Sequence, residues 1–485
     1  MQNNQRIRYC SIGRVKCTLP TRQTMKSGIK ARQSLKNLIK LIPGKQDQGK
    51  LYTHLVTSTV GTFTLKVTST GLAFLTNLLL ARLLGATGYG AYAYAMAWVG
   101  LLSVPATLGF HQLLVRNVAI YHAQENWSLM QGLLRFSNRV VLITSIVLMA
   151  AAAPIGWVLF GSKNEYGMLH ALWLALLMLP ITALTQLRQS ALRGLHQIIR
   201  GQLPEMLIRP LLLVSFIASA YLLFHQYLSA LLAVLFNVVA TLIALAVASH
   251  WLGKVLPEEV KTVEPETRIW PWIRNALPLL LVASIQIINF QIDFILLGAF
   301  KGAEQVGVYA IVKRVTDIIV FVLSAVEVTI APSIASLYAR EQTVQLQQMI
   351  SNTAKIILAV AVPIVAVLVA FGKSILSLFG SDFMSGQLAL VVLSVGQLMN
   401  AGFGPVGQLA IHTGNENGTA LIVGLAALMN ILLNLLLIPK WGVVGAAMAT
   451  AVSLAVWNLL LSVFVYRRTG IISVAFHPRS FWGVR

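Results

Sequence analysis

Ten polar or charged side chains interrupt stretches of this sequence that are otherwise strongly apolar. The cations are Lys66, Lys313 and Arg314, the acids are Asp293, Asp317 and Glu327, and the amides are Asn289, Gln397, Asn400 and Gln408. A charge among apolar groups is costly, so such side chains normally face a partner or a water-filled space. Cations and amides together offer hydrogen bonds to a polar or anionic ligand. We therefore interpret this set as the lining of an internal polar path.

Lys66 is the most isolated of these charges, because no carboxylate lies within one helical turn of it in TSTVGTFTLKVTSTG. The residues that recur on its side of a helix are Thr59, Thr62, Ser69 or Thr70, and Asn77. Side chains three or four positions apart share one face of a helix. The pattern predicts one wall of a hydrated cavity with a cation at mid-depth.

Four more polar stripes recur at helical spacing. They comprise Gln286, Asn289 and Asp293; Lys313, Asp317, Ser324 and Glu327, with Arg314 beside them; Gln397, Asn400, Gly404 and Gln408; and Asn430 with Asn434. Amides often hydrogen-bond between membrane helices, which favours a packing role for Asn289, Asn430 and Asn434. Lys313 with Asp317 could be a self-contained i, i+4 pair. The three acids Asp293, Asp317 and Glu327 could fix the cations or bind a coupling proton or sodium ion.

The segments that position these residues are long and apolar enough to cross a membrane. The chain is 57% hydrophobic and only 11% charged, with a mean hydropathy of +0.75, which excludes a soluble domain. Twelve candidate spans are centred near Leu65, Leu101, Ile146, Leu177, Ser215, Ala240, Ile287, Val320, Val362, Leu398, Leu428 and Val456. The sequence predicts an all-α polytopic membrane protein with about twelve transmembrane helices.

Lys and Arg are distributed unequally between the two sides of the predicted bundle. With a cytoplasmic N-terminus, twelve lie in the first 50 residues and seventeen, Arg209 among them, in the other inward-facing segments. The outward loops hold only Lys163, Lys301, Lys373 and Lys440. Positive charge is retained on the cytoplasmic side, so both termini are predicted to be cytoplasmic. Arg82, Arg116 and Arg188 lie near span ends, where they would serve as interfacial anchors.

An internal repeat divides the chain into two halves. LLGATGYGAYAYA, from Leu83 to Ala95, returns as LLGAFKGAEQVGVYA, from Leu296 to Ala310. A hydrophilic stretch separates six predicted spans from six, so both halves enter the membrane from the same side. Two parallel six-helix lobes around a central cavity are expected. Aligning the copies at Leu83 and Leu296 sets Lys66 opposite Leu279 and Asp293 opposite Leu80.

The predicted domains follow from these boundaries. They are a basic cytoplasmic tail (1–50), an N-terminal six-helix lobe (51–252), a cytoplasmic linker (253–274), a C-terminal six-helix lobe (275–468) and a cytoplasmic C-terminal tail (469–485). The first tail supplies about half of the net charge of +22 and would suit an anionic membrane surface, or is a solvated or misassigned start with Met25 as the true beginning. Its Cys10 and Cys17 form no metal-binding pattern. No fold for nucleic-acid binding accompanies it.

Motifs of catalysis are absent from the sequence. There is no G-x-S-x-G, no P-loop and no H-E-x-x-H. Transport is therefore favoured over catalysis, with no catalytic residues and no metal site.

The C-terminal stretch from Thr413 to Leu461 resembles the signature of the polysaccharide-export and oligosaccharide-lipid flippase family. That family belongs to the multidrug, oligosaccharidyl-lipid and polysaccharide exporter superfamily. The matching elements are Asn430 and Asn434, then Leu437-Ile438-Pro439, then Gly442 through Thr450. ARLLGATGYGAYAYA with residues 109–116, and DFILLGAFKGAEQVGVYAIVKRV, resemble two helix hairpins of the same family. The resemblance covers roughly residues 51–468.

This resemblance implies alternating-access transport of a polyprenyl-(pyro)phosphate-linked oligosaccharide, a polysaccharide or O-antigen repeat unit, across a bacterial cytoplasmic membrane. Polysaccharide polymerase machinery would be a partner, and the only cofactor would be a coupling proton or sodium ion. The phosphates would meet Lys66, Lys313 and Arg314. The sugar hydroxyls, or the closing contact of the lobes, would involve Asn289, Gln397, Asn400 and Gln408.

Three alternatives remain open. A cation-coupled multidrug exporter of the same superfamily would prefer an acidic, aromatic cavity, and a lipid II flippase usually has more helices. A membrane glycan polymerase or glycosyltransferase would need a catalytic loop outside the membrane, which the sequence does not offer.

Overall fold

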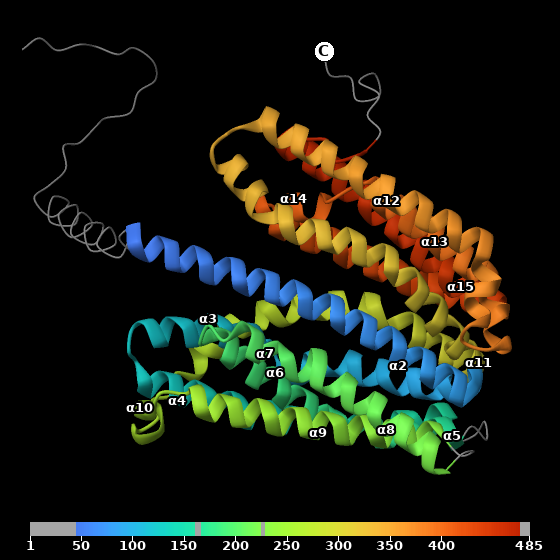
Figure 1. The fold of residues 1–485 in the computed structure, drawn as a ribbon, viewed down its shortest axis with the longest axis horizontal. Helices are drawn as coiled ribbons and strands as arrows, with labels where there is room; N and C mark the ends of the chain where they lie inside the picture. Colours follow the sequence, from blue (N-terminus) through green and yellow to red (C-terminus); the bar gives the residue numbers. More distant parts are fainter. Residues whose placement is uncertain (1–44, 161–165, 225–227, 476–485) are drawn as a thin grey trace, which may run out of the picture. The chain divides into compact units, whose positions relative to one another are not determined.

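The computed structural model describes residues 45–160, 166–224 and 228–475. Most of the predicted basic tail, including Cys10 and Cys17, lies outside the described residues. The chain divides into two compact units, residues 1–61 and 62–485. The second unit holds the helices and the cavity considered below (Figure 1).

Helices make up nearly all of the described chain, and no strand occurs in these residues. Their order is α2 (Lys45–Thr107), α3 (Phe110–Ala123), α4 (Trp127–Phe160), α5 (Tyr166–Leu176), α6 (Met178–Gly194), α7 (Ile198–Leu203), the π-helix η1 (Pro204–Ile208), α8 (Arg209–Phe224), α9 (Ala230–Val255), α10 (Glu258–Thr262), α11 (Ile269–Ala339), α12 (Thr343–Ser377), the 3₁₀ helix η2 (Ser381–Gly386), α13 (Gln387–Gly402), α14 (Val406–His412) and α15 (Glu416–Thr469).

Nine of the described helical stretches are long and apolar enough to cross a membrane. Three of them, Thr64–Thr107, Ile269–Glu327 and Glu416–Thr469, contain 44, 59 and 54 residues. At 1.5 Å per residue even the shortest would extend about 66 Å, roughly twice the hydrocarbon core of a bilayer. Each of the three must therefore hold two crossing segments.

A glycine divides each of these long helices. The backbone leaves helical geometry at Gly85, Gly302 and Gly442, all with positive φ, a conformation that costs glycine little. The nine stretches thus supply the twelve crossing segments that hydropathy predicts, and the predicted all-α membrane bundle is confirmed. We call the end of the bundle that carries these glycines the turn end, and the end that carries residues 257–268 the linker end.

Hydrogen bonds across two of the turns show that the chain reverses there. The Tyr89 hydroxyl donates to Asn77 Oδ1 at 2.7 Å, although the two residues flank Gly85. The Tyr309 hydroxyl donates to Asp293 Oδ2 at 2.7 Å across Gly302. Sixteen residues of straight helix would separate the second pair by about 24 Å, so the segments must run antiparallel, side by side.

The turn glycines correct the alignment of the internal repeat. Gly85 is equivalent to Gly302, and Gly90 to Gly307, because the second copy carries four extra residues before its turn. Aligning the two LLG triplets, as predicted from the sequence, therefore shifts the segments before the turns by four residues relative to each other. In the corrected register Lys66 lies opposite Ala283 and Asp293 opposite Thr76.

The repeated glycines also bring the two lobes together. Gly90 packs against the backbone of Ala303 and Gly307, and Gly307 packs against the backbone of Ala86 and Gly90, leaving no room for a Cβ at either glycine. Ala86 and Ala303 are themselves equivalent in the repeat. We call these four residues the glycine seam; its two halves are related by the same pseudo-symmetry as the lobes.

At the linker end, the first turns of α11 belong with the N-terminal lobe. Trp272 is buried and donates from Nε1 to the Tyr121 hydroxyl at 3.1 Å. The linker is attached to the same lobe, because the Glu266 N–H donates to the Ser128 carbonyl at 3.1 Å. The long helix α11 thus begins on one lobe and ends in the other.

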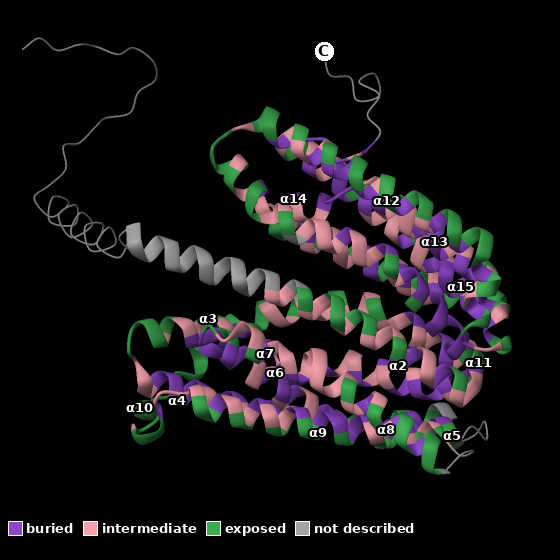
Figure 2. Cartoon of the chain, in the orientation of Figure 1, coloured by how far each residue is buried: buried purple, intermediate pink, exposed green. Residues whose placement is uncertain are grey.

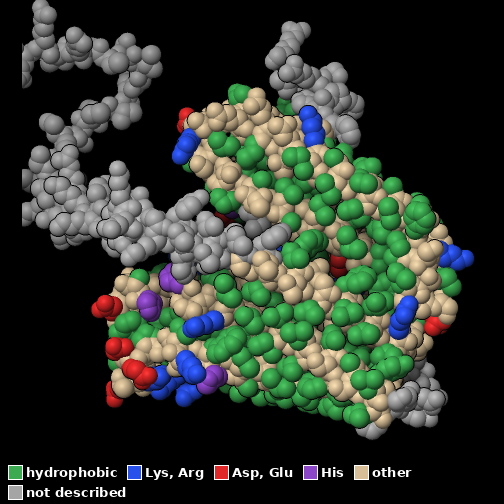
Figure 3. Space-filling model, viewed as in Figure 1, with side chains coloured by type: hydrophobic (Ala, Val, Ile, Leu, Met, Phe, Trp, Pro, Cys, Tyr) green, Lys and Arg blue, Asp and Glu red, His purple; other side chains and the backbone are tan. Residues whose placement is uncertain are grey.

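The last described residues cross the linker end of the C-terminal lobe. Ile471, Ile472 and Ser473 are buried, and both backbone groups of Ile472 hydrogen-bond to the Gln347 amide at 2.7 Å. Buried residues gather where helices pack against one another (Figure 2), and many large apolar side chains are exposed. On the face shown in Figure 3, hydrophobic side chains dominate and most charges lie toward the helix ends. This is the surface expected of a protein that contacts lipid.

Candidate ligand-binding cavity

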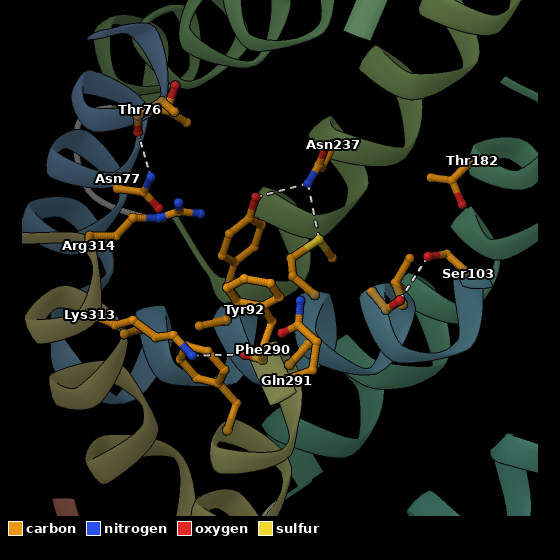
Figure 4. Close-up of a pocket in the computed structure, with 18 of the residues that line it drawn as sticks. Thr76, Asn77, Tyr92, Ser103, Thr182, Asn237, Phe290, Gln291, Lys313 and Arg314 are labelled. Carbon is orange, nitrogen blue, oxygen red and sulfur yellow. Dashed lines mark hydrogen bonds between the residues drawn. The ribbon is translucent and has the colours of Figure 1, made fainter. Parts of the chain in front are cut away.

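A cavity of about 610 Å³ lies between the lobes and is bounded by α2, α6, η1, α8, α9 and α11 (Figure 4). Its size is that of a typical small-molecule site, for which about 300–1,000 Å³ is usual. The charged side chains in its wall are Glu205, Arg209, Lys313, Arg314 and Asp317. The uncharged polar ones are Thr76, Asn77, Tyr89, Tyr92, Ser103, Thr182, Gln186, Asn237 and Gln291.

Lys313 is held in this wall by three kinds of contact. Its Nζ donates to the Phe290 carbonyl at 2.9 Å and lies 3.7 Å from Asp293 Oδ2. The same ammonium stands over the Phe294 ring, 4.9 Å from its centroid. The Lys313 side chain is 18% exposed, so the ammonium retains a path to a ligand while its position is fixed.

Arg314 projects into the cavity beside Lys313 (Figure 4). Its Nη1 lies 3.6 Å from Asp317 Oδ2, and both side chains are about half exposed. Because the pair is exposed and not hydrogen-bonded at that distance, the guanidinium remains available to an anion. The predicted residues Lys313, Arg314 and Asp317 therefore meet in one cavity.

Asp293 lies behind this wall rather than in it. The carboxylate is fully buried and accepts hydrogen bonds from Tyr309, Asn434 and Thr450, each at 2.7 Å. Asn434 Oδ1 is buried with no hydrogen-bond partner in the described residues. The asparagine expected to serve in packing is therefore part of a polar cluster around a carboxylate.

On the opposite wall, Arg209 is fixed by an amide. Its Nε donates to Asn237 Oδ1 at 3.0 Å, and Asn237 Nδ2 donates to the Tyr92 hydroxyl at 2.9 Å. Glu205 lies 3.8 Å from the guanidinium and also accepts a hydrogen bond from Gln189. The sequence placed Arg209 in an inward-facing segment; the structure places it in the cavity wall.

Lys66, Glu327 and Gln408 form a separate group. Lys66 is 19 residues from Gly85, about 28 Å along the helix, so it lies near the linker-end boundary of its span and not at mid-depth. It does not line the cavity. Its charge acts on Glu327, and the Gln408 side chain lies close to the same carboxyl group.

Three predicted amides lie elsewhere. Gln397 and Asn400 hydrogen-bond to each other, and Asn458 Nδ2 donates to Asn400 Oδ1 at 2.8 Å, which joins α13 to α15. Asn289 lies on the face of α11 turned away from Phe290 and Gln291, which line the cavity. The polar stripe through Asn289 was therefore the wrong face for this cavity.

Several lining residues were not singled out from the sequence. Aromatic and amide residues within apolar spans, such as Tyr89, Tyr92 and Gln291, can line a cavity, but the same residue types are also common in the packed core. The sequence therefore could not distinguish these three. Glu205 and Arg209 had a stronger signal: an i, i+4 ion pair between two prolines, Pro204 and Pro210, at the start of an apolar run.

Comparison with known proteins assigns the chain. Residues 55–338 match the family described as polysaccharide biosynthesis protein, and residues 278–436 match the MatE family. The chain belongs to the polysaccharide biosynthesis protein family. Similarity to a probable low-salt glycan biosynthesis flippase, Agl15 of Haloferax volcanii, is 25% identity over 419 residues, 84% of this chain and 82% of that protein. A probable flippase of the same organism, AglR, is 30% identical over 172 residues, 35% of this chain and 36% of that protein.

This polysaccharide biosynthesis protein has the same fold as several membrane transporters of known structure. An inward-facing multidrug resistance MATE family transporter of the MOP superfamily has a TM-score of 0.69 at 15% identity, covering 83% of this chain and 94% of that one. The lipid II flippase MurJ, in an inward closed conformation, has a TM-score of 0.65 at 14% identity, covering 84% and 87%. The chain is thus a multi-pass membrane protein with a two-lobed transporter fold.

Proposed function

We propose that the protein is a flippase that moves a polyprenyl-diphosphate-linked oligosaccharide across the cytoplasmic membrane by alternating access. The observation that carries this proposal is the pair Lys313 and Arg314, two adjacent cations in a cavity whose wall also offers amides, hydroxyls and aromatic rings. Cations recognise phosphate oxygens, and the uncharged groups match sugar hydroxyls and ring faces. The flippase names of the relatives support the same class of cargo.

In this proposal Lys313 and Arg314 receive the diphosphate. Asn77, Gln291 and the tyrosines Tyr89 and Tyr92 meet the sugars. Lys66 with Glu327 and Gln408 contributes near the linker end, which we propose faces the cytoplasm together with both termini. Gln397, Asn400 and Asn289 support helix packing. Polysaccharide polymerase machinery is the proposed partner.

Asp293 is the strongest candidate for energy coupling by a proton or sodium ion. Its carboxylate is buried, and the side-chain oxygens of Asn434 and Thr450 lie in the same cluster. Oxygen atoms of these kinds are the ligands that hard cations prefer. The unpartnered Asn434 Oδ1 fits such an ion. Asp317 and Glu327 are better suited to fixing the cations Arg314 and Lys66, beside which they lie.

A test uses the purified protein in liposomes with a fluorescent lipid-linked oligosaccharide and a reagent that quenches only the outer leaflet. Lys313→Gln and Arg314→Gln are each expected to slow flipping about tenfold or more, because a charged contact to phosphate is lost. Lys301→Gln, an exposed lysine of the same helix, is the control and should leave the rate unchanged. Wild-type liposomes that flip no such lipid, or that take up cationic drugs instead, would overturn the proposal.

Coupling is tested with Asp293→Asn in the same liposomes. The variant should lose the acceleration that a sodium or proton gradient gives to the wild type while keeping its slow gradient-independent rate. An Asp293→Asn protein that still responds fully to both gradients would remove Asp293 from coupling.

A further inference from the structure

The proposed diphosphate site leaves one charged feature of the cavity unused, at the start of α8. Here the Arg209 N–H donates to the Pro204 carbonyl, five residues earlier, which defines a π-turn. Pro204 and Pro210 lack an N–H, so neither can support an ordinary helical bond at this point. Single π-turns within helices occur frequently at functional sites. This one sets Glu205 and Arg209 in the cavity wall together.

A buried amide orients the guanidinium of Arg209. Asn237 is 1% exposed, and its Nδ2 is directed to the Tyr92 hydroxyl at 2.9 Å and Met96 Sδ at 3.2 Å. Its Oδ1 therefore faces Arg209 Nε, at 3.0 Å. An arginine carries five N–H groups, and within the described residues only the one on Nε has a hydrogen-bond partner. The terminal nitrogens retain their donors.

All three cations in the cavity wall share one further property: each has a carboxylate nearby that is not hydrogen-bonded to it. The distances are 3.8 Å for Arg209 and Glu205, 3.7 Å for Lys313 and Asp293, and 3.6 Å for Arg314 and Asp317. In the exposed linker the corresponding ion pairs are formed at 2.7 and 2.9 Å. Charge-assisted hydrogen bonds are normally about 2.7–2.9 Å long. The cavity carboxylates therefore balance charge without occupying the N–H donors.

We propose that Arg209, oriented by Asn237 and with the Tyr92 hydroxyl beside it, forms a second oxyanion subsite, on the wall of the N-terminal lobe, that binds a carboxylate or phosphate carried by the glycan. Glu205 balances the charge of Arg209 without a hydrogen bond to it, and the oxyanion of the cargo displaces it while it keeps its hydrogen bond from Gln189. The proposal rests on the proposed flippase function. It assigns the cargo to the class of acidic oligosaccharides.

The position of the subsite separates it from the diphosphate site. Asn237, to which Arg209 is bound, lies on the far side of the Tyr92 side chain from Lys313 and Arg314 (Figure 4). The two sites also belong to different lobes, so a cargo with two anionic groups would contact both. The Arg209 and Glu205 side chains are 24% and 39% exposed, which leaves both open to such a ligand.

The test measures binding to the full-length protein in lipid nanodiscs. Four ligands are compared: polyprenyl diphosphate alone, and the same lipid bearing a neutral, a uronic-acid or a phosphorylated oligosaccharide. Wild-type protein should bind one or both acidic glycans about tenfold more tightly than the neutral one, since a charge-assisted contact is gained. The arm that shows the preference identifies the oxyanion. Arg209→Gln should abolish the preference while leaving the affinity for polyprenyl diphosphate intact.

Two further variants guard against a merely misfolded protein. Glu205→Gln removes the competing carboxylate and should strengthen binding of the acidic glycan, which a damaged protein would not do. Arg200→Gln, an exposed arginine of the preceding helix, should behave as wild type. Equal binding of acidic and neutral glycans by the wild type, or equal losses for both on Arg209→Gln, would overturn the subsite. Failure of the wild type to bind any lipid-linked glycan would instead overturn the flippase proposal.

Discussion

The glycine seam between the lobes allows a quantitative prediction. A Cβ at Gly90 would overlap the Ala303 carbonyl, which is backbone and cannot rotate away. Gly90→Ala therefore forces the two helices apart. Overpacking of this kind costs about 1–3 kcal/mol. Alanine is also intrinsically better than glycine in a helix by about 0.8–1 kcal/mol, so the net loss should be roughly 0–2 kcal/mol, with the seam opened in either case.

Gly71 supplies the matched control, because within the described part of the chain nothing beyond the local helix backbone lies within 4 Å of a Cβ placed there. Gly71→Ala should raise the melting temperature or leave it unchanged. Gly90→Ala and Gly307→Ala should each have a lower melting temperature than Gly71→Ala. Thermal unfolding of the detergent-solubilised protein, followed by intrinsic fluorescence, measures the difference. The double variant should cost less than the sum of the two single ones, because the first Cβ already separates the helices. Gly90→Ala with the melting temperature of Gly71→Ala, or strict additivity, would refute the seam.

Two other predictions concern the linker end. Gln347→Leu removes both hydrogen bonds to the Ile472 backbone and should destabilise the protein by about 2 kcal/mol, at about 1 kcal/mol for each bond. Substitution of its exposed neighbour, Gln348→Leu, is the control and should leave the stability unchanged. Equal melting temperatures for the two variants would show that these hydrogen bonds do not stabilise the protein. Burial first, and then the nearby Arg193, lower the pKa of His111, which lies outside the membrane spans and contacts Thr107 Oγ1 at 3.2 Å. Near pH 6 the unfolded chain therefore binds a proton at His111 more readily than the folded chain does, so the free energy of unfolding should fall as the pH drops below about 6.5. In His111→Gln the melting temperature should change less between pH 7.5 and 5.5 than in the wild type. The same pH dependence in both proteins would contradict this assignment.

The number and order of the helices could be predicted from the sequence because they depend on length and hydropathy alone. A bilayer requires about 20 apolar residues for each crossing, and the twelve predicted centres all fall within the observed segments. The two adjacent cavity cations, Lys313 and Arg314, could also be predicted, because a charged side chain within a span normally faces the bundle interior or a water-filled cavity.

The face that each helix turns to the cavity could not be predicted in the same way. In the first half of α11 the more polar face, through Asn289, is not the lining one, because Phe290 and Phe294 supply much of the cavity wall. An aromatic wall cannot be distinguished from core by its composition. At Arg209 a π-turn adds a residue to the helical turn and shifts every later position around the axis, so ordinary periodicity gives the wrong register.

The internal repeat explains why the two halves of the cavity differ in charge. Tyr92 and Tyr309 are equivalent positions, each two residues beyond a seam glycine, and each hydroxyl contacts a polar side chain on the last crossing segment of its own lobe: Asn237 for Tyr92 and Thr450 for Tyr309. Beyond this shared element the lobes diverge. The N-terminal lobe adds a cation, Arg209, and the C-terminal lobe adds an anion, Asp293. A guanidinium attracts anions and a carboxylate attracts cations, so in the proposed function Arg209 would meet an acidic group of the cargo and Asp293 would meet a coupling cation. In that proposal an acidic group of the glycan beside Tyr92 and a coupling cation beside Tyr309 would occupy equivalent places, while Lys313 and Arg314 of the C-terminal lobe bind the diphosphate.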